Sequence, residues 1–350
     1  MTQINGITDF LTQAGTQFKV FDMGRRIEEI SPQTFLAFEM GEAPYPLALQ
    51  QQAWLAILVW NEQTHDNENH SSEDRDHERV TWFLRFPLDA AGKLTSGIRD
   101  DFVLRLLNRE DSSSENENNP YGFKPKQEHM AWFHARASQL LGQPASSYYE
   151  HARDYFAGKP GYDQWAFVGF QGIADIVARL DESNNTELLS HSITEMPAQP
   201  FEALAQCLEH QKINHPLSQS ITNILQRELN KTEPSANFIS LCIRALSNTQ
   251  NQALLNQHIE TVLNSDVSTH PEILASISGR CWQILLNEKT IALYLEALSR
   301  CNEGQEFFNL VIVDLINIPG MQQSILKAVK SPERSERLSR SIGELFKTFT

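Results

Sequence analysis

FEALAQCLEH (201–210) places its apolar residues at the spacing of an amphipathic α-helix, and the pattern recurs along the chain. Three later segments share it: FISLCIRALSN (238–248), LASISGRCWQILLN (274–287) and FFNLVIVDLINI (307–318). Each of the four is followed by a second apolar stripe: SQSITNILQREL (218–229), NQALLNQHIETVL (251–263), EKTIALYLEAL (288–298) and MQQSILKAV (321–329). A fifth, earlier unit is indicated by FQGIADIVARL (170–180) and ELLSHSITEM (187–196). This pattern predicts stacked pairs of helices.

The spacing of these units is that of two-helix repeats. Cys207, Cys242 and Cys281 occupy similar places in successive units and lie 35 and 39 residues apart, within the range of helical solenoids. The units resemble HEAT-type repeats in length and in having two amphipathic helices. No proline or arginine recurs at a fixed position in them, so we predict irregular stacking of helix pairs and not a regular superhelix.

A polar linker separates this part of the chain from the beginning. DSSSENENN (111–119) is a low-complexity segment, and the pattern after residue 125 is almost entirely helical. We therefore predict an α+β protein with a small mixed domain at 1–110, a polar linker at 111–124 and a mainly α-helical, repeat-like domain at 125–350. The second domain is predicted to be an irregular α-solenoid.

The first 110 residues mix helical and strand patterns. A short opening helix is predicted to stop at Gly15, and a strand follows around Phe18 and Val20. Ser31 before a proline predicts the start of a second helix, because serine caps free N–H groups and proline suits a first helical turn. That helix is predicted to end at Gly41.

Two further strands are predicted from aromatic and β-branched residues: QQAWLAILVW (51–60) and RVTWFLRFP (79–87). We expect them to pair as an antiparallel hairpin and to form, with the earlier strand, a three-stranded antiparallel sheet. Their connection at 62–78 is dense in Asp, Glu, Asn, Ser and His, so it is predicted to be a mobile acidic loop.

The first of these strands is apolar on both faces. Trp54 and Leu58 share one face, while Leu55 and Ile57 share the other, so both faces should be covered. The sheet has more apolar area than its own helices can cover. We expect the surplus to pack on the helical array, or alternatively on a second subunit, which would make a homodimer through the N-terminal sheet.

Charge and hydropathy limit the partners. With 29 Lys and Arg against 44 Asp and Glu, the formal charge is −15, which argues against nucleic acid or an anionic membrane as the main partner. No apolar run approaches the roughly 20 residues that span a bilayer, and the N-terminus has no signal-peptide pattern. The four cysteines all lie in apolar helical patterns, as in a reduced cytosolic protein. We therefore expect a cytoplasmic location.

Catalytic and cofactor motifs are missing from the sequence. The loop at 62–78 gathers His65, His70 and His77 among carboxylates, but metal sites need ligands held by a scaffold, so we predict no metal site there. H-E-x-x-H, G-x-S-x-G and phosphate-loop patterns do not occur. We predict no cofactor and no catalytic residues, and an enzyme is the less favoured alternative.

Aromatic residues concentrate where the two predicted domains meet. Domain junctions are frequent pocket sites, so this set is a candidate ligand or peptide groove, with core packing as the alternative. The candidate binding residues are Tyr121, Trp132, Tyr149, Tyr162 and Trp165.

Three segments resemble a bacterial protein family of unknown function: PYPLALQQQAWLAILVW (44–60), WFLRFPLDAAGKL (82–94) and GRCWQIL (279–285). The resemblance spans nearly the whole chain. It implies a bacterial cytosolic protein and supplies no catalytic residues.

Two functions remain open at this point. Stacked helix pairs commonly present an extended surface, which favours a non-enzymatic protein–protein interaction or scaffold protein. The alternative is an enzyme or small-ligand sensor with a pocket at the junction of the two domains.

Overall fold

The computed structural model describes residues 4–61, 79–108 and 119–347. The chain divides into two compact units: Met1–Lys126 with Asn317–Pro319, and Gln127–Ile316 with Gly320–Thr350. The predicted acidic loop at 62–78 lies outside the described residues, as does most of the predicted linker at 111–124.

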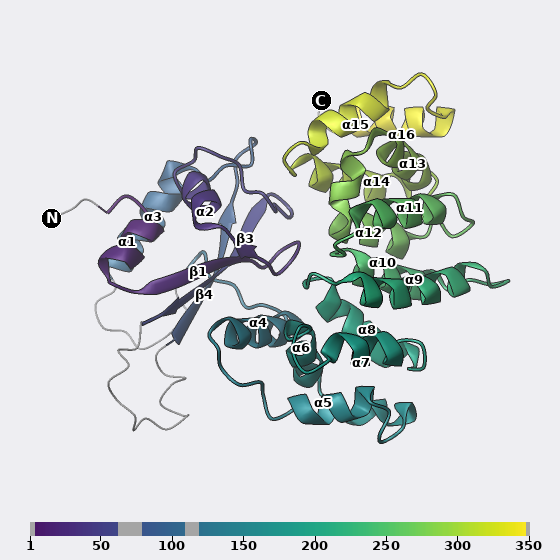
Figure 1. The fold of residues 1–350 in the computed structure, drawn as a ribbon. Helices are drawn as coiled ribbons and strands as arrows, with labels where there is room; N and C mark the ends of the chain where they lie inside the picture. Colours follow the sequence, from purple (N-terminus) through teal and green to yellow (C-terminus); the bar gives the residue numbers. More distant parts are fainter. Residues whose placement is uncertain (1–3, 62–78, 109–118, 348–350) are drawn as a thin grey trace. The chain divides into compact units, whose positions relative to one another are not determined.

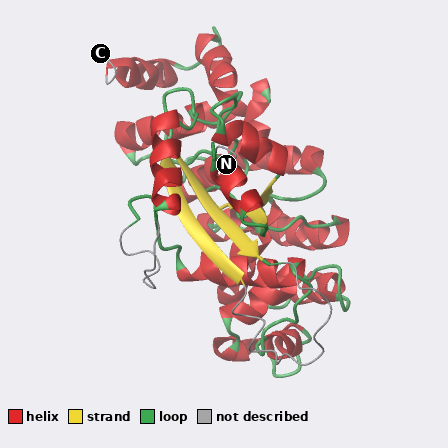
Figure 2. Ribbon diagram, turned by 90° about the vertical axis from the view of Figure 1, so that its left-hand side faces the viewer, coloured by secondary structure: helices red, strands yellow, loops and turns green. Residues whose placement is uncertain are grey.

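The first unit contains a four-stranded antiparallel sheet in the order β2-β1-β3-β4 (yellow in Figure 2). Its strands are β1 (Gln17–Asp22), β2 (Glu29–Ile30), β3 (Gln52–Trp60) and β4 (Arg79–Pro87). The predicted hairpin is confirmed, with Leu55 opposite Leu84 and Ile57 opposite Trp82. The sequence predicted three strands, one fewer than this sheet contains, because a two-residue strand such as β2 shows no periodicity in the sequence.

Three helices accompany the sheet: α1 (Ile7–Gln13), α2 (Pro32–Glu39) and α3 (Ser96–Leu107) (Figure 1). Phe10 of α1 packs against Trp82 and Phe102 of α3 against Phe86, so both helices cover the same face of β4. Ser31 caps α2 as predicted, accepting a hydrogen bond from the Thr34 amide at 3.1 Å.

The second unit is an array of helices in two layers (Figure 1). One layer contains α4 (Gln127–Leu140), α6 (Phe170–Ala178), α8 (Ala198–Leu208), α10 (Ala236–Leu246), α12 (Pro271–Arg280) and α14 (Gly304–Ile316). The other contains α5 (Tyr149–Phe156), α7 (Asn185–Ser192), α9 (His215–Leu229), α11 (Gln252–Leu263), α13 (Glu288–Ser299) and α15 (Met321–Lys330). Two short 3₁₀ helices, η2 (Tyr162–Phe167) and η3 (Trp282–Leu286), and the final helix α16 (Glu336–Lys347) complete the unit.

The predicted helical array is confirmed, and each of the five predicted units is a pair of helices, from α6–α7 to α14–α15. Polar contacts between neighbouring pairs repeat the spacing of the sequence. Glu209 and Arg244 are 35 residues apart, Thr222 and His258 are 36 apart, and each pair is in contact. Equivalent positions of successive pairs therefore meet, as expected of stacked repeats.

Side-chain caps mark where many of these helices begin. Asn214, Ser235, Asn251 and Asn287 each accept a hydrogen bond from a backbone amide in the first turn of the helix that follows. Such caps satisfy N–H groups that have no partner within the helix. The apolar stripes behind them form the core between the two layers.

Candidate functional site

A cleft of about 470 Å³ opens in the second unit. It is formed by the end of α4, the α4–α5 connection, the start of α5 and the α6–α7 connection. Polar side chains dominate its lining: Gln139, Gln143, Ser146, Tyr149, Arg179 and Glu182 are among them. The volume is within the 300–1,000 Å³ range of ligand pockets, and the lining includes a buried charged residue, Arg179, so we take this cleft as the candidate site.

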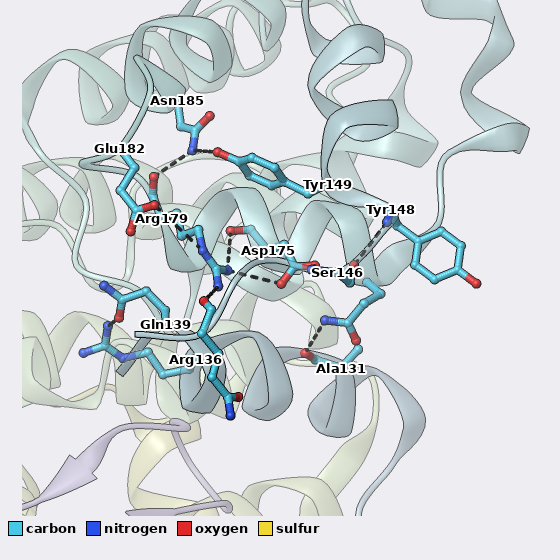
Figure 3. Close-up of polar contacts among 12 residues, drawn as sticks. Ala131, Arg136, Gln139, Ser146, Tyr148, Tyr149, Asp175, Arg179, Glu182 and Asn185 are labelled. Atoms are coloured by element: carbon cyan, nitrogen blue, oxygen red, sulfur yellow. Dashed lines mark hydrogen bonds and ion pairs between the residues drawn. The ribbon is translucent and has the colours of Figure 1, made fainter. Parts of the chain in front are cut away.

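Arg179 is the central charged residue of this cleft (Figure 3). It follows α6 directly and is only 4% exposed. Its Nη1 donates to Asp175 Oδ1 at 3.3 Å, and its Nη2 donates to the Gln143 carbonyl at 3.2 Å. Its Nε lies 3.8 Å from Glu182 Oε2, too far for a good hydrogen bond. The guanidinium is thus fixed in place by helix α6 and by the α4–α5 connection.

Asp175 balances the charge of Arg179 and orders the neighbouring loop. It is almost fully buried, one helical turn before Arg179, and its Oδ2 accepts a hydrogen bond from the Ser146 amide at 3.1 Å. A buried carboxylate is tolerated when it is paired and hydrogen-bonded, and both conditions hold here. The loop that forms one wall of the cleft is therefore tied to α6.

Asn185 determines the hydrogen bonding of Tyr149 (Figure 3). Its Nδ2 donates to the Arg179 carbonyl at 2.7 Å and to Tyr149 Oη at 2.9 Å. A backbone carbonyl only accepts, so the amide nitrogen of Asn185 must face it, and the opposite amide orientation is excluded. Tyr149 Oη consequently accepts from Asn185, and its own hydrogen is left to donate elsewhere.

The α6–α7 connection is held in an uncommon backbone conformation. Ser183 and Asn184 have φ values of 49° and 59°, in the left-handed region that non-glycine residues seldom adopt. Arg153 stabilises this turn, because its Nη2 donates to the Ser183 carbonyl at 2.8 Å. Its guanidinium also lies 5.7 Å from the ring centre of Tyr149. The turn and Tyr149 are thus positioned by the same arginine.

The exposed charged residues that line the cleft are acidic. Glu150 and Glu182 both line it, and Glu182 is half exposed. The positive charge of Arg179 is already balanced by buried Asp175. Two exposed carboxylates thus line the cleft, with hydrogen-bond donors from Tyr149 and Arg179 on its walls, and the Arg153 guanidinium lies beside them, against Ser183 and the Tyr149 ring.

Of the five predicted binding residues, Tyr149 lines this cleft. Trp132 is buried in α4, with its ring 5.9 Å from that of His210. Tyr162 donates to the Phe156 carbonyl at 3.3 Å, and burial raises its pKa. Trp165 is on η2 and partly exposed. These three contribute nothing to the lining of the cleft.

Tyr121 belongs to the first unit. Its ring packs on Phe86 and Phe102, and its hydroxyl donates to Asp101 Oδ2 at 2.9 Å. Burial and this hydrogen bond raise the pKa of Tyr121. The predicted pocket between the two parts of the chain stays a prediction.

The residues of the cleft that the sequence analysis missed are Asp175, Arg179, Glu182 and Asn185. A signal was present for two of them. FQGIADIVARL (170–180) is apolar apart from Gln171, Asp175 and Arg179, and the two charged residues stand four apart on a helix that is buried nearly all round. Charged residues are rarely fully buried unless they are paired, so this spacing indicates an internal ion pair.

A second group of buried charges joins helices elsewhere in the array. Glu209, at the end of α8, is 2.6 Å from Arg244 Nε of α10 and 2.9 Å from Arg280 Nε of α12. Burial alone would raise the pKa of Glu209, but the charges of Arg280, His210 and Arg244 outweigh it and hold the pKa at about 2. This group links three successive helices, so its role is structural.

Metal binding has no support among the residues that the structure describes, which hold no group of three or more His, Cys, Asp or Glu side chains suited to an ion. The histidine-rich segment at 62–78 lies outside them. Within the same described ranges, no helix has the length and apolar character needed to cross a membrane.

The fold and the cleft define the class: a helical-array protein in which stacked helix pairs follow a small α+β unit. The chain belongs to the family described as protein of unknown function (DUF3549), whose model matches residues 2–346. The predicted resemblance to a family of unknown function over nearly the whole chain is thereby confirmed. No curated protein and no solved structure matches the chain.

Proposed function

We propose that the protein is a cytosolic, non-enzymatic interaction protein whose helical array binds another protein. The observation that carries the proposal is the two-layer array itself, in which successive helix pairs stack with neighbouring faces side by side. Arrays of this kind present extended surfaces suited to a protein partner. Two further features of the array support the same function: its exposed apolar side chains and the use of its buried charges.

Large apolar side chains lie exposed on the array. Phe167 is 72% exposed, Leu310 is 59% exposed and Tyr148 is 57% exposed. Single exposed apolar residues are common, but an exposed phenylalanine and tyrosine in neighbouring segments are typical of a contact surface. The Tyr148 ring packs against Gly169, within van der Waals distance of the position that a Cβ atom would occupy on that residue. Tyr148 therefore belongs to the same local surface as Phe167.

The buried charges of the array are engaged in holding helices together. Asp175 of α6 pairs with Arg179, which follows that helix, and Glu209 pairs with Arg244 and Arg280 across three helices. Groups of this kind are stable because their charges are satisfied internally. They supply rigidity to a binding scaffold, which keeps the cost of ordering low when a partner binds.

Affinity purification of the full chain from its native host tests the proposal. We expect one partner to be recovered reproducibly with the wild-type protein and to be depleted by Phe167→Ser or Leu310→Ser. Leu104→Ser, which changes an exposed leucine of the first unit, is the matched control and should leave recovery unchanged. Recovery that is equal for all variants, or no reproducible partner with the wild type, would count against the proposal.

A further inference from the structure

We propose that the cleft beside Arg179 binds a short peptide segment of the partner protein that carries a lysine or arginine side chain. This inference rests on the proposed function, since it names the kind of partner segment that the array would take. It is carried by two features of the cleft: hydrogen-bond donors on its walls and carboxylates at its rim.

The first feature is a donor that the protein leaves unused. Asn185 donates to Tyr149 Oη at 2.9 Å, and its orientation is fixed by its second bond, to the Arg179 carbonyl. Tyr149 therefore keeps its own hydroxyl hydrogen, for which the described residues offer no acceptor within hydrogen-bonding distance. Because Tyr149 lines the cleft, that hydrogen is available to an acceptor on a ligand.

Arg179 adds a second donor on the same wall. Its Nη1 and Nη2 groups are engaged by Asp175 and Gln143, whereas its Nε lies 3.8 Å from Glu182 Oε2, beyond good hydrogen-bonding distance. A main-chain carbonyl is the acceptor that suits both donors. A phosphate or carboxylate ligand fits less well, since Asp175 already neutralises the guanidinium and the exposed charged side chains that line the cleft, Glu150 and Glu182, are carboxylates.

The second feature is the charge of the rim. Glu150 and Glu182 line the cleft and are exposed to solvent, so a cationic side chain placed there meets two carboxylates at little cost in desolvation. The chain as a whole has a formal charge of −15, which draws a basic segment toward it from a distance. The carboxylates that line the cleft and the net negative charge of the chain thus both favour a basic ligand.

The walls of the cleft are also held in place by contacts within the protein, so the site is preformed. The Ser146 amide bonds to Asp175, Arg179 bonds to the Gln143 carbonyl, and Arg153 bonds to the Ser183 carbonyl. These contacts fix both connections that form its walls. A preformed site loses little conformational entropy when it binds, so a short peptide can bind it without refolding the protein.

Calorimetric titration of the full chain with blocked peptides tests this assignment. The probes are Ac-Gly-Gly-Lys-Gly-Gly-NH₂, the same peptide with arginine, and the same peptide with glutamate at the centre. We expect saturable binding of the two basic peptides, weakened by salt as an ionic contact requires, and no binding of the acidic one. Equal binding of the acidic peptide, or no saturable binding of either basic peptide, overturns the proposal.

Variants locate the binding to the cleft. Tyr149→Phe and Glu182→Gln should each weaken binding of the lysine peptide about fivefold, as expected for the loss of one hydrogen bond or one charge contact. Tyr162→Phe and Glu187→Gln make the same changes at residues outside the lining and should leave affinity unchanged. Unfolding temperatures of all four variants confirm that the fold is retained. Unchanged affinity in both cleft variants overturns the assignment.

The affinity purification above separates the two proposals. If the partner is recovered equally with the double variant Tyr149→Phe/Glu182→Gln but lost with Phe167→Ser, the cleft assignment fails while the interaction function stands. If no partner is recovered with the wild type although the lysine peptide binds at the cleft, the interaction function fails and the peptide-binding geometry stands.

Discussion

Asp22 of the first unit is a fully buried carboxyl held by a tyrosine hydroxyl and two backbone amides. Tyr45 donates to its Oδ1 at 2.7 Å, and the amides of Gly24 and Arg26 donate to its Oδ2. Burial raises the pKa of Asp22 to about 7, because these hydrogen bonds only partly offset the loss of hydration. The residue thus titrates near neutrality.

This shift predicts a pH-dependent stability. The unfolded chain loses the Asp22 proton near its ordinary pKa of 3.8, whereas the folded protein keeps it until about pH 7. Between these values the folded state binds more protons, so its contribution to the free energy of unfolding is fully present below about pH 4 and falls as pH rises to about 7. The slope from this group is at most ~1.4 kcal/mol per pH unit.

Urea unfolding of the wild type and Asp22→Asn at several pH values between about 4 and 8 measures the effect. Asparagine does not titrate, so the difference in unfolding free energy between the two proteins should change with pH in favour of the wild type at the acidic end. Asp100→Asn, at an exposed position on α3, should run parallel to the wild type. Parallel profiles for all three proteins would contradict the assignment.

At the level of single residues, the sequence singled out Tyr149 as a candidate but none of the residues that contact it. Asn185 is 36 residues away and Arg153 bonds to a residue 30 positions away. These separations are close to the repeat length, so the partners are set by how one helix pair stacks on the next. Residue type alone does not specify that register, because it depends on the packing of the whole pair.

At the level of the helices, the ionic group around Glu209 connects three successive helices of one layer. Its carboxylate binds Arg244 and Arg280, and so connects α8 with α10 and α12. Removing one member of a buried ion pair leaves the other charges uncompensated. The two arginine side chains are partly exposed, at 25% and 20%, so water compensates some of the loss.

Glu209→Gln should therefore lower the free energy of unfolding by about 2–4 kcal/mol. Denaturant unfolding followed by circular dichroism measures it, since the array supplies most of the helical signal. Glu202→Gln replaces an exposed glutamate on the same helix and should change stability by no more than about 0.5 kcal/mol. If Glu209→Gln lowers the free energy of unfolding no more than this control does, the ionic group around Glu209 is not needed for stability.

The helices and strands themselves were largely predictable, because their patterns are long and consistent. β3 and β4 are rich in aromatic and branched residues over nine positions each, and all five helix pairs carry clear apolar stripes. β2 was missed because its two residues form a strand only by pairing with β1. Strand formation of that kind depends on a neighbour in space, which periodicity does not report.

For the molecule as a whole, the oligomeric state stays a prediction. The apolar surplus of the N-terminal sheet predicts packing on the array or a homodimer through the sheet, and a homodimer has twice the mass of the monomer. Light scattering during size-exclusion chromatography distinguishes them directly. A dimer that is disrupted by Arg85→Glu, a change at an exposed position on the face of β4 opposite Trp82 and Phe86, would support the homodimer; a monomer at all concentrations would exclude it.

The end of the array must be covered, because a stacked helix pair buries its apolar face only against the next element. Helix α16 provides this cover. Leu338, Ile342 and Leu345 form a buried stripe on it, and Gln305 of α14 donates to the Ser341 carbonyl at 2.8 Å. Leu338→Asp or Ile342→Asp places a charge in that interface and should release the helix, since a buried unpaired charge is strongly unfavourable.

We expect both variants to expose the apolar surface of α13 and α14 and to form soluble aggregates on heating at a temperature where the wild type does not, measured by light scattering. Arg340→Asp puts the same charge on the exposed side of α16 and should behave as the wild type. If all three variants aggregate alike, the added negative charge causes the aggregation wherever it lies on α16. If none does, α16 is not needed to close the array, and the final pair, α14–α15, must be stable with its outer face in water.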